Sequence, residues 1–210
     1  MKQKIHLSAN ETKPQIIEPI VLSIGGPSGV GKTTIIRRMR SRMGEDIMLH
    51  PAFTTRPKRE GEVEGVDYFF RTESDLMLSR SDPRYSGFVE ARGNWYWVSI
   101  SYLLRRILDN PKKIHVLFNS QRAEIEYRRK LFPKLQWIWL DANLADLELR
   151  LRARGDENVA QSMAHNRKLQ RQYIDDLVDL KIFTQNGELD VAVEEIAAFC
   201  GRLKHQRGIK

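Results

Sequence analysis

A glycine-rich loop at Gly26–Thr33 (GPSGVGKT) restricts this chain to few folds. It fits the pattern G-x-x-x-x-G-K-[ST]. The apolar, β-branched run Ile20–Ile24 precedes it and predicts a buried parallel strand, and Lys32–Arg42 continues it with a helical charge pattern. Glycines let the backbone wind so that its amides point inward, and the helix N-terminus adds its positive dipole end. The segment therefore predicts a site for a nucleoside triphosphate.

Individual roles follow from the chemistry of the motif. Lys32 is expected to reach the β- and γ-phosphates, and the hydroxyl of Thr33 is expected to bind Mg²⁺. The residues predicted to contact the nucleotide are Gly26, Ser28, Gly29, Gly31, Lys32, Thr33 and Thr34.

Strands that alternate with helices predict the architecture. The expected strands are Ile20–Ile24, Lys113–Phe118, Leu135–Leu140 and Lys181–Thr184. The expected helices are Lys32–Arg42, Ser120–Lys130, Ala145–Ala153, Ala160–Leu180 and Leu189–Leu203. This order implies an α/β fold, a P-loop NTPase three-layer sandwich with a parallel sheet covered on both faces. With 210 residues, 41% of them hydrophobic, the chain can build one good core.

The middle of the chain predicts a smaller unit inserted at about residues 51–98. Pro51–Phe70 is rich in loop residues, and Glu73–Arg80 is typical of a short helix. Phe88–Val98 predicts a strand pair that turns at Gly93-Asn94. Ser99–Asp109 then predicts an amphipathic helix that leads back to the core.

The net charge of +8 is concentrated in two segments. Gly201–Lys210 carries four basic residues and no acidic one, and residues 204–210 are expected to form a basic, solvated tail rather than a nucleic-acid contact. Ile35–Glu60 carries seven basic and three acidic residues, which suits an anionic small molecule near the glycine loop. A nucleic-acid partner is therefore not expected.

Several function classes are disfavoured. Residues 1–18 are polar and predict a flexible leader without a secretory signal, and no apolar run is long enough to span a bilayer. Cys200 is the single cysteine, so no internal disulfide can form. The five histidines lack ligand spacing, so no metal is expected beyond magnesium carried by a nucleotide. The expected location is the cytoplasm, and the oligomeric state stays open.

Three further residues are expected to be structural. Trp137 and Trp139 share one strand face and are expected in the core. Asp141 follows that strand and could contact Mg²⁺ through water, although we expect it to cap the next helix.

Four motifs in order resemble the guanylate kinase family. Gly26–Thr33 is similar to that family's GPSGxGK[ST] loop, and Thr54–Tyr68 is similar to its TTRxxRxGExxGxDY stretch. Glu90 before Gly93–Tyr96 resembles the family's E…GNYYG, and Arg150–Gly155 resembles its R-L-x-x-R-G lid. The resemblance covers about residues 19–203, with the lid at about 150–168.

This resemblance implies ATP-dependent phosphoryl transfer to the phosphate of a nucleoside monophosphate, with ATP and Mg²⁺ as cofactors and GMP as the favoured acceptor. Lys32, Arg150 and Arg154 would then be the catalytic residues. The implied acceptor site is made of Arg56, Arg59, Tyr68, Glu90, Tyr96 and Asn119. Arginines clamp phosphates through charge-assisted hydrogen bonds, and a Glu90 carboxylate would accept from guanine N1–H and N2–H₂.

Departures from the family pattern keep an alternative open. Ala52, Val98 and Asn119 stand where the family has two serines and an aspartate, and Trp97 replaces a glycine. His165 stands where another lid arginine is usual, with Arg167 two residues beyond.

Two further segments resemble a second enzyme family. Phe118–Arg122 (FNSQR) and Arg154–Asn158 (RGDEN) resemble segments of ribose 1,5-bisphosphate phosphokinases, which phosphorylate a sugar phosphate. A non-catalytic guanylate kinase-like scaffold is a weaker alternative, because such scaffolds usually lack the loop lysine that is present here as Lys32.

Overall fold

The computed structural model of the protein describes residues 18–118, 122–172, 177–185 and 188–209. Its larger part is a sheet of five parallel strands in the order β2-β7-β1-β8-β9. The strands are β1 (Ile20–Gly25), β2 (Ile47–His50), β7 (Ile114–Phe118), β8 (Gln136–Asp141) and β9 (Leu180–Phe183). The predicted parallel α/β architecture is confirmed.

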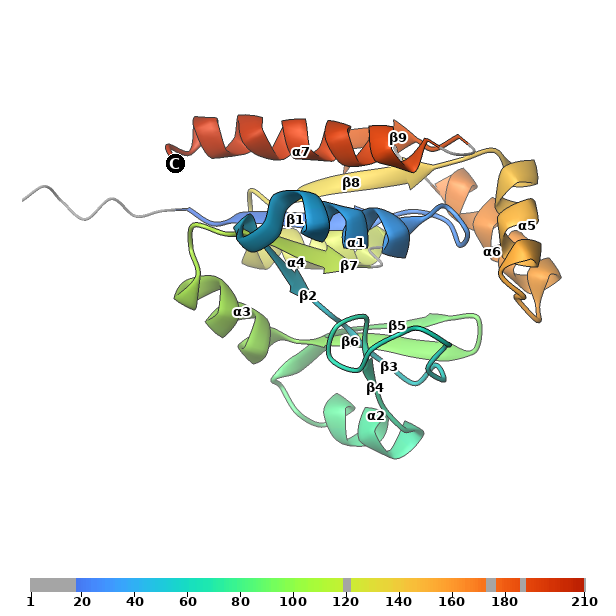
Figure 1. The fold of residues 1–210 in the computed structure, drawn as a ribbon. Helices are drawn as coiled ribbons and strands as arrows, with labels where there is room; N and C mark the ends of the chain where they lie inside the picture. Colours follow the sequence, from blue (N-terminus) through green and yellow to red (C-terminus); the bar gives the residue numbers. More distant parts are fainter. Residues whose placement is uncertain (1–17, 119–121, 173–176, 186–187, 210) are drawn as a thin grey trace, which may run out of the picture.

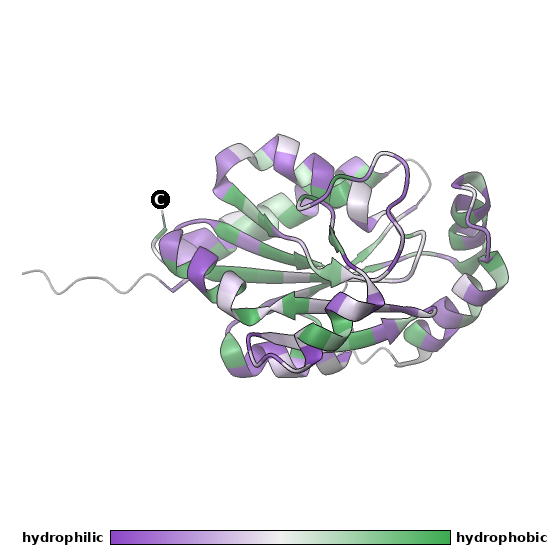
Figure 2. Cartoon of the chain, turned by 90° about the horizontal axis from the view of Figure 1, so that it is seen from below, coloured by the Kyte–Doolittle hydropathy of each residue, from purple (hydrophilic) through white to green (hydrophobic). Residues whose placement is uncertain are grey.

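Helices cover both faces of this sheet (Figure 1). One face packs against α1 (Lys32–Met43) and α7 (Leu189–Gln206), and the other against α3 (Ile100–Asp109) and α4 (Arg122–Leu131). Alternation along β1 explains the division, because Leu22 belongs to the first apolar cluster and Val21 to the second. Figure 2 shows the sheet strands as largely hydrophobic, whereas the helices carry both hydrophobic and hydrophilic residues.

The second apolar cluster includes the two tryptophans of β8. Trp137 and Trp139 are each 3% exposed and meet edge to face with ring centroids 5.6 Å apart. Their predicted place in the core is confirmed.

A small second sheet forms the inserted unit (residues 51–99), which we call the acceptor sub-domain after the role that the sequence resemblance implies for it. Its strand order is β4-β3-β6-β5. The strands are β3 (Phe53–Thr54), β4 (Phe69–Phe70), β5 (Tyr85–Ala91) and β6 (Asn94–Ser99), with helix α2 at Glu73–Arg80. Trp97 is 1% exposed and stacks with Phe53 and Phe88, so it forms the centre of this unit.

The lid segment consists of α5 (Leu144–Ala153), α6 (Val159–Gln172) and the loop between them. It stands at the end of the large sheet, beside the glycine loop and across from the β5–β6 hairpin (Figure 1). The site described below lies where the glycine loop, acceptor sub-domain and lid segment meet.

Three expectations about elements are corrected. The edge strand β2 was not foreseen, because four residues between polar segments carry little periodicity, yet β2 pairs along β7. The helix expected through Leu180 is described as far as Gln172, and it cannot include Leu180, which pairs with Ile138 of β8 as part of β9. The turn expected at Gly93-Asn94 lies one residue earlier, at Arg92-Gly93.

The basic stretch at the end of the chain is not a solvated tail where the structure describes it. Helix α7 continues to Gln206, and Lys204 pairs with Asp46 at 2.7 Å. Arg207 donates to the backbone carbonyls of Pro19 and Lys134, and Ile209 is 8% exposed. Two of the four basic residues of this segment, Lys204 and Arg207, thus hold the end of α7 against the rest of the fold.

No helix in the described ranges has the length and apolar character needed to cross a membrane.

Candidate active site

The glycine loop depends on close packing against the sheet. A Cβ atom on Gly26 would lie 2.4 Å from the Leu140 carbonyl oxygen, so only glycine fits there. Gly31 has φ of 101° and forms the N-cap of α1. The first turn of α1 contains no acidic residue, which leaves its positive dipole end unopposed. The conformation of the loop is therefore suited to binding an anion at the N-terminus of α1.

Lys32 is folded back onto this loop. Its Nζ donates to the carbonyl oxygens of Gly26 and Pro27, each at 2.8 Å. Burial lowers the pKa of Lys32 to about 7, and the positive charges of Arg92, Arg154 and Arg59 act in the same direction. A polyphosphate would supply the negative charge that this cluster lacks.

Thr33 and Thr34 line the same cavity as Lys32, on the first turn of α1. A hydroxyl beside phosphate oxygens fits Mg²⁺, which prefers oxygen ligands and keeps several waters. Within the described ranges, no group of three acidic, histidine or cysteine side chains could hold a metal by itself. Any magnesium here would thus depend on the nucleotide for most of its ligands.

Asp141 does not cap the helix that follows it in the chain. Its Oδ1 accepts from the Ala142 amide at 2.9 Å and from Gln170 at 2.8 Å. Helix α5 begins only at Leu144, with Asn143 at the N-cap, so Asp141 is too early in the chain to cap it. The expectation of a helix cap is wrong.

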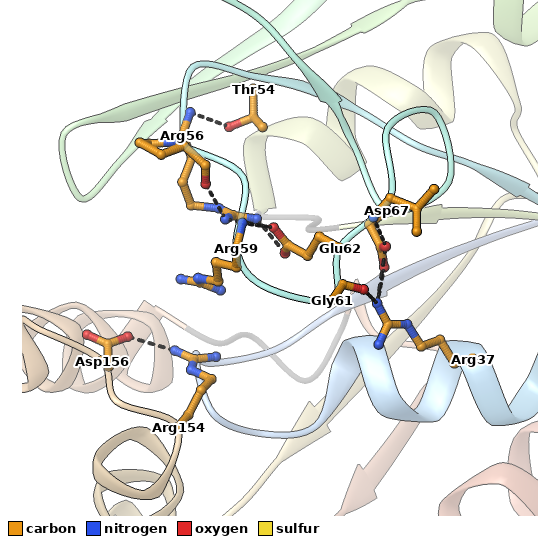
Figure 3. Close-up of polar contacts among 11 residues, drawn as sticks. Arg37, Thr54, Arg56, Arg59, Gly61, Glu62, Asp67, Arg154 and Asp156 are labelled. Atoms are coloured by element: carbon orange, nitrogen blue, oxygen red, sulfur yellow. Dashed lines mark hydrogen bonds and ion pairs between the residues drawn. The ribbon is translucent and has the colours of Figure 1, made fainter.

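Two arginines of the acceptor sub-domain differ in their partners (Figure 3). Both guanidinium NH₂ groups of Arg56 bind the Glu62 carboxylate, at 2.8 and 3.0 Å. The same carboxylate accepts from the Arg59 backbone amide at 2.8 Å. Burial opposes ionisation of Glu62, but these hydrogen bonds hold its pKa below the ordinary value. The Arg59 guanidinium donates no hydrogen bond within the described part of the chain.

Aromatic rings and a second ion pair fix this segment. The guanidinium carbon of Arg56 lies 5.2 Å from the centre of the Tyr68 ring, and the Tyr68 and Tyr96 rings are 6.0 Å apart. Arg37 of α1 pairs with the buried Asp67 carboxylate at 2.9 Å (Figure 3). The acceptor sub-domain is thereby tied to the helix that follows the glycine loop.

The lid segment contributes two more arginines. Arg150 donates to the Thr184 hydroxyl at 3.2 Å, which ties α5 to the end of β9. Arg154 pairs with Asp156 at 2.7 Å (Figure 3).

The glycine loop, the acceptor sub-domain and the lid segment together line one cavity of about 460 Å³. It is lined by Ser28, Gly29, Gly31, Lys32, Thr33, Thr34, Arg37, Arg38, Arg56, Arg59, Glu62, Tyr68, Arg92, Tyr96, Arg150, Arg154 and Leu189. Eight of the lining residues are basic, and Glu62 is the single acidic one among those described. Such a cavity is suited to two phosphate-bearing molecules. Of the predicted site residues that the structure describes, Gly26 and Glu90 are the two that do not line this cavity.

A second cavity of about 70 Å³ adjoins the first through Ser28, Lys32, Arg92 and Tyr96. Gly26 lines it, and its other walls are largely apolar: Val89, Ala91, Trp139, His165 and Leu169. Val89 and Ala91 face this cavity from alternate positions of β5, so the intervening Glu90 points to the opposite face, where it is exposed. The structure does not place Glu90 in either cavity. Asn119 lies outside the described residues.

Two residues were missed by sequence reasoning. Asn166 of α6 is fully buried, accepts from the Ser28 amide at 2.8 Å and donates to the Ser28 carbonyl at 2.9 Å. It connects the lid to the glycine loop, and no local sequence pattern points to it. Arg92 occupies the tip of the β5–β6 hairpin, and it was missed because the turn was expected one residue later, at Gly93-Asn94.

Comparison with known proteins agrees with this geometry. Residues 17–202 match the family model described as guanylate kinase. The guanylate kinase of Bacillus subtilis is 30% identical over 192 residues, covering 90% of this chain and 92% of that protein. The guanylate kinase of Mycoplasmoides gallisepticum is 34% identical over 139 residues, which cover 66% and 70% of the two chains.

A solved structure supports the fold. The crystal structure of guanylate kinase from Anaplasma phagocytophilum superposes with a TM-score of 0.61 at 20% identity, covering 89% of this chain and 86% of that one. Together with the family match over most of the chain, this confirms the resemblance seen in the motifs: the chain belongs to the guanylate kinase family of phosphotransferases.

Proposed function

We propose that this protein transfers the terminal phosphoryl group of ATP to the phosphate of a nucleoside monophosphate, with GMP as the acceptor and GDP as the product. The observation that carries the proposal is the shared cavity. Lys32 of the glycine loop, Arg59 of the acceptor sub-domain and Arg154 of the lid line one space of about 460 Å³. An ATP phosphate chain on the loop and an acceptor phosphate beside Arg59 would meet there.

The reaction places few demands on side-chain chemistry. The bond between the terminal phosphorus of ATP and its bridging oxygen breaks, and a bond forms from that phosphorus to an acceptor phosphate oxygen. That oxygen is already ionised, so no general base is required. Catalysis then consists of positioning and of stabilising negative charge on the phosphoryl oxygens. Lys32, Arg150 and Arg154 are proposed for the second task, and Arg59 with the Arg56–Glu62 pair for the first.

Magnesium carried by the nucleotide is proposed to have the Thr33 hydroxyl as its protein ligand. When bound, such an ion would neutralise negative charge on the phosphates.

Steady-state assays with Mg-ATP and a panel of acceptors test the proposal. The panel contains GMP, dGMP, AMP, UMP, CMP and ribose 1,5-bisphosphate, with ADP release as the readout. We expect the highest kcat/KM for GMP, and no turnover by Lys32→Ala under the same conditions. Turnover with none of these acceptors would refute the proposed reaction, whereas a higher kcat/KM for another nucleotide would refute only the choice of acceptor.

One observation favours a second acceptor, a sugar phosphate such as ribose 1,5-bisphosphate. Glu62 is the single carboxylate among the described residues that line the two cavities, and it is committed to Arg56. Guanine offers two donors at N1 and N2, which a carboxylate would satisfy. A sugar phosphate makes no such demand. If ribose 1,5-bisphosphate is used and GMP is not, the second candidate replaces the first.

A further inference from the structure

Arg92 occupies a backbone conformation that does not suit it. It lies with Gly93 in the two-residue turn between β5 and β6, with φ of 56° at Arg92 and 73° at Gly93. Among the described residues, Arg92 is the one non-glycine residue with positive φ. Such turns favour Asn, Asp or Gly, and the left-handed conformation costs other residues about 1–2 kcal/mol. Backbone conformations of this kind concentrate at functional sites, which indicates that the contacts of the Arg92 side chain offset the cost of its backbone conformation.

The Arg92 side chain crosses from the acceptor sub-domain to the lid. Although the residue lies at a hairpin tip, its side chain is only 19% exposed. Nη1 donates to the Ser162 hydroxyl of α6 at 2.9 Å and lies 3.7 Å from an Asp156 oxygen. Arg92 also lines both cavities, on the side where they join at Lys32. Its guanidinium is therefore held inside the site and not in solvent.

The junction of the two cavities carries more positive than negative charge. Arg92, Arg154 and Arg59 are the three guanidinium groups whose charges lower the pKa of Lys32, in addition to the effect of burial. Asp156 is shared by Arg154, at 2.7 Å, and Arg92, at 3.7 Å. Glu62 is the other described carboxylate near these four cations, and it is already paired with Arg56. The cluster therefore carries excess positive charge, which a bound anion would balance.

We propose that Arg92 binds the phosphoryl group while it passes from ATP to the acceptor phosphate, together with Lys32 and Arg154; this rests on the proposed function. Negative charge on the equatorial oxygens of that group needs donors from several directions. Lys32 approaches from the glycine loop and Arg154 from the lid. Arg92 adds a donor from the acceptor sub-domain, and its reach depends on this sub-domain lying against the lid.

Arg92→Asn tests the proposal, because asparagine tolerates positive φ and shortens the side chain. We expect kcat to fall about 100-fold, as for loss of one preorganised donor. The Kd for Mg-ADP is expected to stay within threefold. The Kd for the complex with Mg-ADP, aluminium fluoride and GMP, which mimics the transferring group, is expected to rise about 100-fold. Arg84→Asn is the matched control, since Arg84 lies in the same sub-domain, is exposed, and pairs with Asp82 outside both cavities.

Each outcome bears on the proposal. If the wild type transfers phosphoryl groups and kcat of Arg92→Asn stays within threefold, Arg92 does not act on the phosphoryl group and the proposed function stands. Equal weakening of both complexes would assign Arg92 to joining hairpin and lid, and would also overturn the proposal. A wild type that uses no acceptor would overturn the proposed function itself. Arg92→Gly, which also fits the turn, must repeat the result, and thermal unfolding reports whether both variants are folded.

Discussion

The Arg56 guanidinium and the Glu62 carboxylate bind each other through two hydrogen bonds of 2.8 and 3.0 Å, with both side chains at most 10% exposed. Both residues belong to the stretch expected to hold the acceptor phosphate. Glu62 therefore has two effects, since it neutralises Arg56 and, through the Arg59 amide, fixes the loop that carries Arg59. The two arginines occupy similar positions in the motif but have different electrostatic environments.

This difference predicts different results for two alanine variants. Arg59→Ala removes a guanidinium that donates no hydrogen bond within the described residues, so the fold is expected to be unaffected. The acceptor KM is expected to rise about 10- to 100-fold, because a hydrogen bond to a charged group contributes about 1.5–3 kcal/mol. Arg56→Ala is expected to raise the acceptor KM as well and to lower the free energy of unfolding by about 1–3 kcal/mol, since the largely buried Glu62 carboxylate loses its partner.

Steady-state kinetics and urea unfolding of the two variants, with Arg84→Ala as the control, measure this split. Equal unfolding free energies for Arg56→Ala and Arg59→Ala would contradict the structural role of the Arg56–Glu62 pair. A large rise in the ATP KM for Arg59→Ala would place that arginine on the nucleotide side of the cavity.

The environment of Lys32 predicts that ATP binding takes up a proton. In the described structure its amino group donates to two loop carbonyls and has a pKa of about 7. Phosphates of a bound nucleotide favour the charged form, so binding must raise this pKa. At pH 8 the free protein holds Lys32 mostly neutral, and ATP binding is expected to take up close to one proton. Affinity for ATP is accordingly expected to fall as the pH rises above 7.

Calorimetric titration of Mg-ATP in buffers of different ionisation enthalpy measures the uptake. Lys32→Met is expected to abolish it and to lower kcat at least 100-fold, because a charge that stabilises the transition state is lost. Unchanged proton uptake in Lys32→Met would assign the proton to another group.

Sequence reasoning was most successful where one local pattern decides the outcome. Gly26–Thr33 specified both a conformation and a chemistry, and the alternation of apolar runs with helical segments specified the parallel sheet. It failed where a contact distant in sequence decides. Strand β2 is formed by pairing with β7, and Arg207 is held by carbonyls near residues 19 and 134.

The candidate site shows the same contrast between local patterns, which sequence reasoning found, and distant contacts, which it missed. Motif residues such as Lys32 and Arg154 were found because type and spacing identify them. The face of a strand on which a residue lies depends on hairpin register, and the turn at Arg92-Gly93 was expected one residue later. That register turns Glu90 outward and Arg92 inward, which a list of matched motif letters does not show.

A buried histidine pair predicts acid sensitivity. Nε2 of His50 lies 2.9 Å from Nδ1 of His115, on neighbouring strands β2 and β7. Burial lowers the pKa of His50 to about 3, and the charges of His115 and Arg106 act in the same direction. The unfolded chain binds this proton near pH 6.5 and the folded chain does not, so stability is lost as the pH falls below 6.5. We expect a loss of about 1 kcal/mol between pH 6.5 and 5.5 from one such group.

Urea unfolding at these two pH values, for the wild type and His50→Gln, measures the contribution. Glutamine can still bind His115 but does not titrate, so the variant is expected to show a smaller loss. The same pH dependence in both proteins would show that His50 contributes nothing to it.

Glu90 provides the last prediction, because its place in the structure conflicts with the role implied by the family resemblance. A carboxylate that read guanine would have to face the acceptor cavity, yet Glu90 is exposed between two β5 residues that line the smaller cavity, Val89 and Ala91. Glu90→Gln is therefore expected to change kcat/KM for GMP and for AMP by less than threefold and to leave their ratio unchanged. Val89→Glu, which adds a carboxylate on the cavity face of the same strand, is the matched comparison and is expected to alter that ratio. Both variants are assayed by ADP release under the same conditions. Loss of GMP preference in Glu90→Gln alone would mean that β5 shifts its register when the acceptor binds, which would bring Glu90 into the cavity.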